Sequence, residues 1–312
     1  MSQQNNVYII FPGFRVQGIE EWYNVKSLKQ ALLCKGISSN LICLDDYTDS
    51  EFSLLPDPAG VIIIHVLTHA IITNFSFKLK VISKWNSVFL NDYSAHDSVS
   101  NKLRMYHILK QNNISIPNTI GLNGYSHISD EYIGQIFNTL GSPLVIKPYR
   151  GFRGQHTALC YDKKDFIENL NIVRSNKKLQ YEKIGIKSSL SVIQEYVKEY
   201  ADMYIRIYAT DTYMGGYLGL VSPFESAAFN NFNKHKFRVP YKIEPEVSIL
   251  LRKTLSVLNI NVAACDLLKD DNGYKIMDIN AFGDFKTYDA VCKVNFVDKI
   301  VECFYNKLIS QG

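Results

Sequence analysis

The chain has 312 residues, of which 46% are apolar and 21% are charged, and this length and balance allow two or three domains around sizeable cores. The formal charge of +4 comes without a block of Lys and Arg, which argues against a nucleic-acid partner and suits an anionic small ligand equally well. The six cysteines show no CxxC spacing, which favours free thiols in a reducing compartment. The sequence has no pattern typical of a signal peptide and no apolar run long enough to cross a bilayer, so we expect a cytoplasmic protein with no membrane partner.

The first part of the chain has the pattern of a small α/β domain. Val7–Phe11 (VYIIF) and the apolar runs at 39–44 and 61–66 have the continuous hydrophobicity of buried parallel strands. Residues 19–35 show helical spacing that ends at Gly36, and one more strand is expected within 82–90. This order predicts a doubly wound sheet over residues 1–95. In the loop 12–18, where such sheets meet ligands, Arg15 either meets an anionic substrate or is a plain surface residue.

The second part, residues 96–190, is expected to combine two helices with a strand and a glycine-rich loop. Asp97 or Ser98 can cap a helix through Lys102, and a second helix covers 130–140. The strand at 143–148 (PLVIKP) carries Lys147 and leads into the loop 149–157, which holds two Gly and two Arg. Backbone N–H groups and cationic side chains both suit anions, so this loop is either a flap over phosphates or a mobile surface hairpin.

The third part, residues 191–312, is expected to be rich in strands. Apolar strands are predicted at 190–197, 203–209 and 212–220, a polar loop at 229–238, and helices at 246–258 and 294–309. Arg206 lies between Tyr204 and Tyr208 on one face of its strand. It either covers apolar surface with its stem or reaches an anion.

A hairpin in this part carries a candidate metal site. Strands at 262–268 and 274–280 flank Asp271-Asn272-Gly273, which suits a three-residue turn with Asp270 and Tyr274 as the closing pair. Counting back from that pair places Asp266 opposite Asp278, with Asn280 on the same face. Their neighbours on this face are apolar: Val262, Ala264, Leu268 and Ile276.

Two facing carboxylates on an apolar face repel each other, and a cation would relieve the repulsion. Two carboxylates and an amide oxygen suit Mg²⁺, which shares its shell with phosphates and waters. The alternative is that one Asp caps a loop and the other is half exposed. A register slip of one residue would separate the pair.

The order of these motifs resembles the ATP-grasp superfamily. Lys102 lies on a helix, Lys147 in VIKP, QEYV at 194–197 precedes DMYIR at 202–206, and CDLL and DIN follow. The succession looks most like the ribosomal-protein glutamate ligase and peptide ligase (RimK-like) branch, over roughly residues 97–285. The resemblance implies an α/β (α+β) chain with an ATP-grasp fold preceded by the doubly wound domain.

The family implies a role for each motif. Lys102 and Lys147 would contact ATP phosphates. The loop that contains Gly151 and Gly154 would close over these phosphates. The nucleotide would also meet Gln194, Glu195, Tyr196 and Val197, which read adenine through the backbone, and Asp202, which reaches the ribose. One or two Mg²⁺ ions, or Mn²⁺, would be held by Asp266, Asp278 and Asn280. Arg206 and Lys147 would be the catalytic residues, and Arg206 would steady a carboxylate or the acyl phosphate.

In such ligases ATP phosphorylates a carboxylate and an amine attacks the acyl phosphate, so the resemblance implies amide formation on an amino acid or peptide. Catalysis is then positioning and charge neutralisation, with no side-chain nucleophile. A homodimer or homotetramer would be common among such relatives.

Two departures leave alternatives open. Relatives in the ligase branch commonly have Glu at the position of Asp278, and Asp-Ile-Asn also resembles inositol-phosphate kinases of the same fold. A kinase of a small polyol or a non-catalytic nucleotide-binding module therefore remain alternatives. The segment 224–238 matches the family poorly, and its candidate ligand residues are Asn231, Asn233 and Lys234.

Overall fold

The computed structural model describes residues 7–12, 19–58, 60–64, 75–122, 128–150, 157–183, 190–197, 203–220 and 237–309. Several predicted ligand residues lie outside the described residues: Arg15, Gly151, Gly154, Asp202, Asn231, Asn233 and Lys234.

The N-terminal domain is built on a parallel sheet with the strand order β2-β1-β3-β4. Its elements are β1 (Val7–Phe11), α1 (Ile19–Cys34), β2 (Ser39–Cys43), the short 3₁₀ helix η1 (Leu44–Asp46), α2 (Asp49–Ser53), β3 (Val61–Ile64), α4 (Ser76–Ile82) and β4 (Val88–Leu90). Ile9 faces the core cluster that includes α1, and Ile10 faces the cluster that includes α4. Both faces of the sheet are thus covered, which explains the continuous apolar runs and confirms the doubly wound prediction.

The central sheet is antiparallel, with the order β5-β8-β6-β7. Its elements are β5 (Thr119–Leu122), α7 (Asp130–Leu140), β6 (Leu144–Pro148), β7 (Ala158–Cys160), α8 (Lys163–Lys183) and β8 (Ser191–Glu195). The predicted boundary at residue 190 assigned 191–195 to the C-terminal part. This assignment is wrong for β8, because both of its edges pair within the central sheet.

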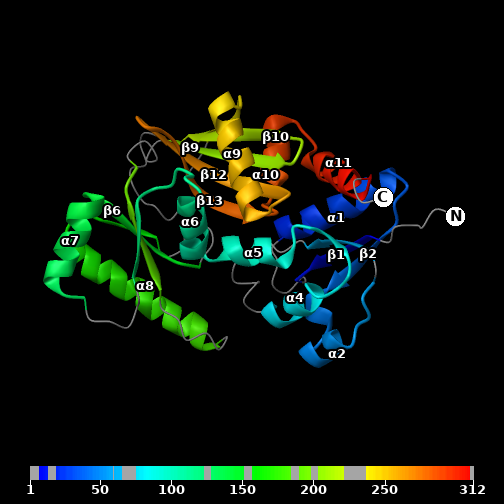
Figure 1. The fold of residues 1–312 in the computed structure, drawn as a ribbon, viewed down its shortest axis with the longest axis horizontal. Coiled ribbons are helices and arrows are strands. Elements are labelled where there is room, and N and C mark those ends of the chain that lie inside the picture. Colours follow the sequence, from blue (N-terminus) through cyan, green and yellow to red (C-terminus); the bar gives the residue numbers. More distant parts are fainter. Residues whose placement is uncertain are drawn as a thin grey trace.

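The C-terminal sheet is antiparallel, with the order β11-β10-β9-β12-β13. Its elements are β9 (Met203–Thr210), β10 (Met214–Leu220), β11 (Phe237–Tyr241), α9 (Pro245–Leu258), β12 (Val262–Asp270), β13 (Gly273–Ala281), α10 (Lys286–Cys292) and α11 (Phe296–Ile309). One face packs against α6 (Lys102–Gln111) and α9, and the other packs against α1, α10 and α11, so one core joins this sheet to the N-terminal domain (Figure 1). Sequence reasoning missed β11 and α10; Pro240 obscured the strand pattern of β11.

Two short helices cross between the domains, α5 (Tyr93–Ser100) and α6 (Lys102–Gln111). Asp92 caps α5 by accepting from the Ala95 N–H at 2.9 Å, and Asn101 caps α6 by accepting from the Arg104 N–H at 3.1 Å. The predicted cap at Asp97 or Ser98 is therefore wrong, because both residues lie inside α5. The break at Asn101 makes Lys102 the first residue of α6.

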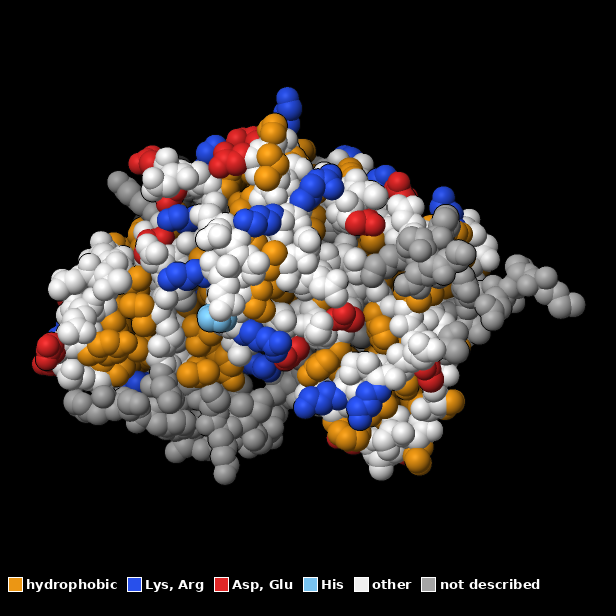
Figure 2. Space-filling view, viewed as in Figure 1, with side chains coloured by type: hydrophobic (Ala, Val, Ile, Leu, Met, Phe, Trp, Pro, Cys, Tyr) orange, Lys and Arg blue, Asp and Glu red, His pale blue; other side chains and the backbone are white. Residues whose placement is uncertain are grey.

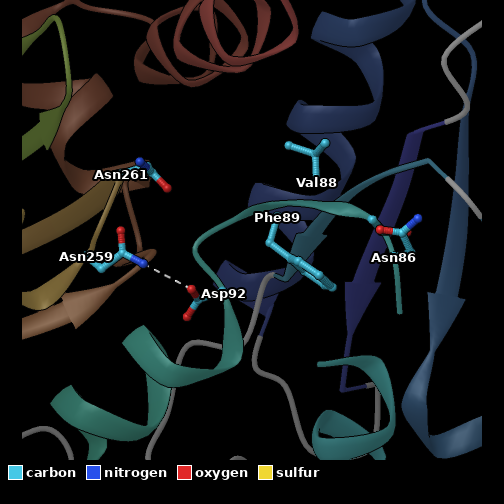
Figure 3. Close-up of a pocket in the computed structure, with 7 residues that line it drawn as sticks. Asn86, Val88, Phe89, Asp92, Asn259 and Asn261 are labelled. Atoms are coloured by element: carbon cyan, nitrogen blue, oxygen red, sulfur yellow. Dashed lines mark hydrogen bonds between the residues drawn. The ribbon is translucent and has the colours of Figure 1, made fainter. Parts of the chain in front are cut away.

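Asn91 joins the N-terminal domain to the start of β12. Its Nδ2 donates to the Val262 carbonyl at 2.5 Å, and its Oδ1 accepts from the N–H groups of Asn261 and Val262 at 2.8 and 3.1 Å. Beside this junction lies a cavity of about 370 Å³ with a mainly polar lining, crossed by the Asn259–Asp92 hydrogen bond of 3.1 Å (Figure 3). The residues that line it are Asn86, Ser87, Val88, Phe89, Asp92, Asn259 and Asn261, and none of them is a predicted site residue.

Candidate nucleotide and metal site

The β12–β13 hairpin places Asp266 directly opposite Asp278, as predicted. The route to this register differs from the prediction. Asp270 pairs with Gly273, at φ +107°, so the turn has two residues instead of three. A β-bulge at Met277 then shifts the register by one residue and brings the two carboxylates face to face.

The bulge also changes which side chains surround the aspartates. Ile276 was expected beside Asp278, but it packs on the opposite face with Cys265, Leu267 and Ile279. This expectation was wrong because the extra residue at Met277 reverses the alternation of side chains along β13. The Met277 carbonyl accepts a hydrogen bond from the Tyr106 hydroxyl, so the bulge is tied to α6.

Arg206 adjoins this pair in a row that runs across four strands. Tyr217 on β10, Arg206 on β9, Asp266 on β12 and Asp278 on β13 are successive cross-strand partners. The Arg206 Nη1 lies 3.2 and 3.3 Å from the two carboxylate oxygens of Asp266. Burial opposes the charge of Arg206, but the Asp266 carboxylate outweighs it and holds the pKa of the guanidinium well above its ordinary value.

Asp266 is 1% exposed, and burial together with the neighbouring Asp278 raises the pKa of its carboxyl to about 6, although Arg206 and Lys102 act in the opposite direction. The Asp266 carboxyl therefore loses its proton at a higher pH than an ordinary aspartate, because its pKa is raised. A divalent cation between the two aspartates would favour the ionised form of both.

The cluster also holds two lysines, one from α6 and one from β6. The Lys102 Nζ lies 2.6 Å from the Asp278 Oδ1, and the Lys147 Nζ lies 3.0 Å from the Tyr106 hydroxyl oxygen. Both lysines are nearly buried, and burial together with the charge of Lys102 lowers the pKa of Lys147 to about 7. More widely, Figure 2 shows Lys and Arg side chains around the hollow between the lobe of the central sheet and the N-terminal domain.

The predicted adenine segment begins at the end of β8, where two side chains have internal partners. The Gln194 Nε2 donates to the Thr119 Oγ1 at 2.8 Å. The Glu195 carboxylate accepts from the Asn118 Nδ2 at 2.6 Å and from the Lys275 Nζ at 2.7 Å. Burial opposes ionisation of Glu195, but the hydrogen bonds from Lys275 and Asn118 prevail and keep its pKa below the ordinary value.

These contacts join the central sheet to the C-terminal hairpin. Lys275 also lies 2.7 Å from Asp270, so it bridges two carboxylates from different sheets. Tyr196 is half-buried and Val197 is buried just beyond β8. Sequence reasoning missed Lys275 and Tyr106; a cationic residue inside the apolar strand 274–280 was the available signal for Lys275.

The donor set at the hairpin fits Mg²⁺. Asn280 faces Ala264 across the ladder and follows Asp278 on the same strand face. Among the described residues no group of three or more His, Cys, Asp or Glu side chains could hold a metal. A cation here would thus use two carboxylates and an amide oxygen and take its other oxygens from phosphates and waters, which is the usual environment of Mg²⁺.

A doubly wound parallel sheet, two antiparallel sheets and a cluster of lysines and carboxylates between them define an ATP-grasp architecture. The family model of the RimK-like ATP-grasp domain matches residues 99–304, and the chain belongs to this family. Both the fold class and the family predicted from the motif order are confirmed.

Individual relatives are distant. The chain is 25% identical over 214 residues to a probable alpha-L-glutamate ligase from Pseudomonas putida, covering 68% of this chain and 65% of that protein, so it spans about two thirds of that relative. Among solved structures, it is similar to D-alanine–D-alanine ligase from Bacillus anthracis, with a TM-score of 0.72, 15% identity and 98% of each chain covered. It is also similar to the ATP-grasp ligase PsnB complexed with a minimal precursor, with a TM-score of 0.66, 14% identity and 99% of each chain covered. No helix within the described ranges is long and apolar enough to span a membrane.

Proposed function

We propose that the protein is an ATP-dependent carboxylate–amine ligase that forms an amide bond on an amino acid or peptide through an acyl phosphate. The observation that carries this proposal is the facing Asp266–Asp278 pair, with Lys102 against one carboxylate and Arg206 against the other. Phosphoryl transfer from ATP needs little covalent chemistry from a protein and much positioning of opposite charges, which such a cluster supplies.

Each charged side chain has a distinct part in this proposal. Lys102 and Lys147 would bind phosphate oxygens, and Asp266, Asp278 and Asn280 would hold one or two Mg²⁺ ions. Mg²⁺ would neutralise the phosphate charge as the phosphoryl group leaves. Arg206 is fixed to Asp266 on one side, and it would hold the substrate carboxylate and then the acyl phosphate.

The relatives guide the choice of first substrates. L-Glutamate is a candidate because the matched Pseudomonas proteins are described as probable alpha-L-glutamate ligases, and a peptide is a candidate because PsnB is described with a minimal precursor. ATP and Mg²⁺ are candidates because solved neighbours are described in complex with ATP, or with Mg and ADP.

The test is incubation of the purified protein with ATP, Mg²⁺, L-glutamate and candidate amines or peptides, followed by mass spectrometry. We expect an amide product with equal amounts of ADP and phosphate. A stable phosphorylated acceptor without amide would refute the ligase proposal and favour a kinase of a small polyol.

A pair of variants in the same hairpin sharpens the assay. Asp278→Asn should lower kcat by roughly a hundredfold or more, because the metal would lose one of its two carboxylate ligands. Asp271→Asn removes an exposed carboxylate of the turn and should leave the rate unchanged. Equal rates in the two variants would remove Asp278 from the site.

A further inference from the structure

Arg206 has a second anchor that none of the predicted roles uses. Its Nε donates to the Tyr208 hydroxyl oxygen at 3.2 Å, and the guanidinium carbon lies 5.7 Å from the centre of the Tyr208 ring. The Tyr208 hydroxyl in turn donates to the carbonyl of Asp284. One phenolic oxygen thus accepts from Arg206 and donates to the segment 282–285 between β13 and α10.

The Asp266 contact alone does not fix the plane of the guanidinium. Both carboxylate oxygens of Asp266 contact the same nitrogen, Nη1, instead of the two nitrogens of a bidentate pair. A planar group held through one nitrogen can still turn about that contact. The bond from Nε to Tyr208 supplies the second point that sets the direction of Nη2.

Tyr208 is itself held firmly. It is 1% exposed and stacks on Tyr288 at 4.6 Å between ring centres, and Phe296 meets it edge to face at 5.4 Å. Burial raises the pKa of its phenol well above the ordinary value, so the hydroxyl keeps its proton and remains a donor to Asp284.

The segment that Tyr208 reaches also passes close to Arg206. A Cβ on Gly283 would clash with the Ala264 side chain and would lie 3.4 Å from the Arg206 Nη2, so the backbone here passes close to the guanidinium. The preceding residue, Phe282, is fully buried with φ +60°, and its N–H donates to the Val262 carbonyl at 3.2 Å. Arg206 is therefore joined to the segment 282–285 through Tyr208, and the same segment passes beside its guanidinium.

We propose that Tyr208 is a positioning residue, whose hydroxyl sets the orientation of the Arg206 guanidinium and joins it to the segment 282–285. This inference rests on the proposed role of Arg206 toward the carboxylate and acyl phosphate. Loss of the hydroxyl frees Nε and lets the guanidinium turn, so the transition state loses a preorganised charge while nucleotide binding by the lysines is unaffected.

The matched comparison is Tyr208→Phe against Tyr204→Phe. Tyr204 lies on the same face of β9, two residues on the other side of Arg206, with the same 1% exposure, and its hydroxyl bonds to the Tyr217 hydroxyl at 3.2 Å. Both variants lose one buried hydroxyl and keep the ring. In the ligase assay Tyr208→Phe should lower kcat about tenfold or more with the KM for ATP within about twofold, and Tyr204→Phe should match the wild type.

A second readout is independent of activity. The Arg206 Nε–H, followed by ¹⁵N NMR, should exchange slowly with water in the wild type, about tenfold faster in Tyr208→Phe and unchanged in Tyr204→Phe. Rapid exchange in the wild type, or equal exchange or equal kcat in the two variants, would overturn the positioning role. Absence of amide formation by the wild type with the expected exchange pattern would instead refute the proposed function alone.

Discussion

Replacement of Asn91 with alanine tests the junction between the N-terminal domain and β12. Asn91 is fully buried at φ +57°, and its amide makes one hydrogen bond to the Val262 carbonyl and accepts from two backbone N–H groups. Alanine removes all three bonds and keeps the left-handed backbone conformation without a side chain that favours it.

The expected magnitude follows from these contacts. Three hydrogen bonds, two of them buried and one part-buried, at about 1 kcal/mol each contribute about 3 kcal/mol, and their backbone partners at Asn261 and Val262 lose the amide. Alanine also lacks the local polar contacts by which asparagine tolerates a left-handed backbone, and this loss adds about 1 kcal/mol. The free energy of unfolding should therefore fall by about 4 kcal/mol.

Asn113→Ala is the matched control. Asn113 also has a left-handed backbone, at φ +53°, but it is exposed, so its replacement isolates the conformational part of about 1 kcal/mol. Unfolding in urea can be followed by tryptophan fluorescence, since both tryptophans, Trp22 and Trp85, belong to the N-terminal part of the chain. If Asn91→Ala and Asn113→Ala differ by less than about 1 kcal/mol, the amide does not hold the junction together.

Three further predictions concern the cluster itself. The pKa of Lys147 is about 7, so this lysine is mostly neutral at pH 8 and should take up a proton when it binds a phosphate. Calorimetry of ADP binding at pH 8 in two buffers should show uptake of about one proton in the wild type and none in Lys147→Met, and equal uptake in both would contradict this. The Lys102 ammonium group lies against one oxygen of Asp278, so Lys102→Met should increase the affinity for Mn²⁺ in the absence of nucleotide about tenfold, as measured by electron paramagnetic resonance. Adding Asp278→Asn should abolish this gain, and an unchanged affinity in Lys102→Met would show that the lysine does not compete with the metal. Lys275→Met leaves the Glu195 carboxylate between the sheets without its cation and should lower the free energy of unfolding by about 2 kcal/mol in urea, whereas an unchanged midpoint would show that this bridge is not stabilising.

The facing aspartates could be predicted from sequence because two differences from the predicted hairpin, a shorter turn and a β-bulge, shift the register in opposite directions and cancel. Hydrophobic alternation located both strands of the hairpin, but it did not reveal that the turn is one residue shorter or that Met277 bulges. The Tyr106 hydroxyl, 171 positions away in the chain, bonds to the carbonyl of that bulged residue, and a contact of this range leaves no mark on local periodicity. The same limit explains why Lys275 was missed, since its partner Glu195 belongs to another sheet.

Helix boundaries show a similar limit. Asp97 and Asn101 are both acceptable cap residues by composition, and the choice between them depends on the Lys102 N–H donating to the Tyr149 carbonyl at 2.9 Å, which is a tertiary contact. The family, by contrast, could be predicted from the order of short motifs. That order does not depend on where each helix or strand begins and ends, so errors in the predicted boundaries do not affect it.

The core that joins α1, α11 and the C-terminal sheet has a consequence for synthesis of the chain. Val25 and Leu28 share this core with Tyr204 and Phe304, so the core closes only after Phe304 has left the ribosome. The central sheet has a separate core within residues 122–193 and can be completed earlier. In the order of folding, the central sheet is therefore a self-contained module inserted into a discontinuous one, and the core that α1 shares with the C-terminal sheet is completed after it.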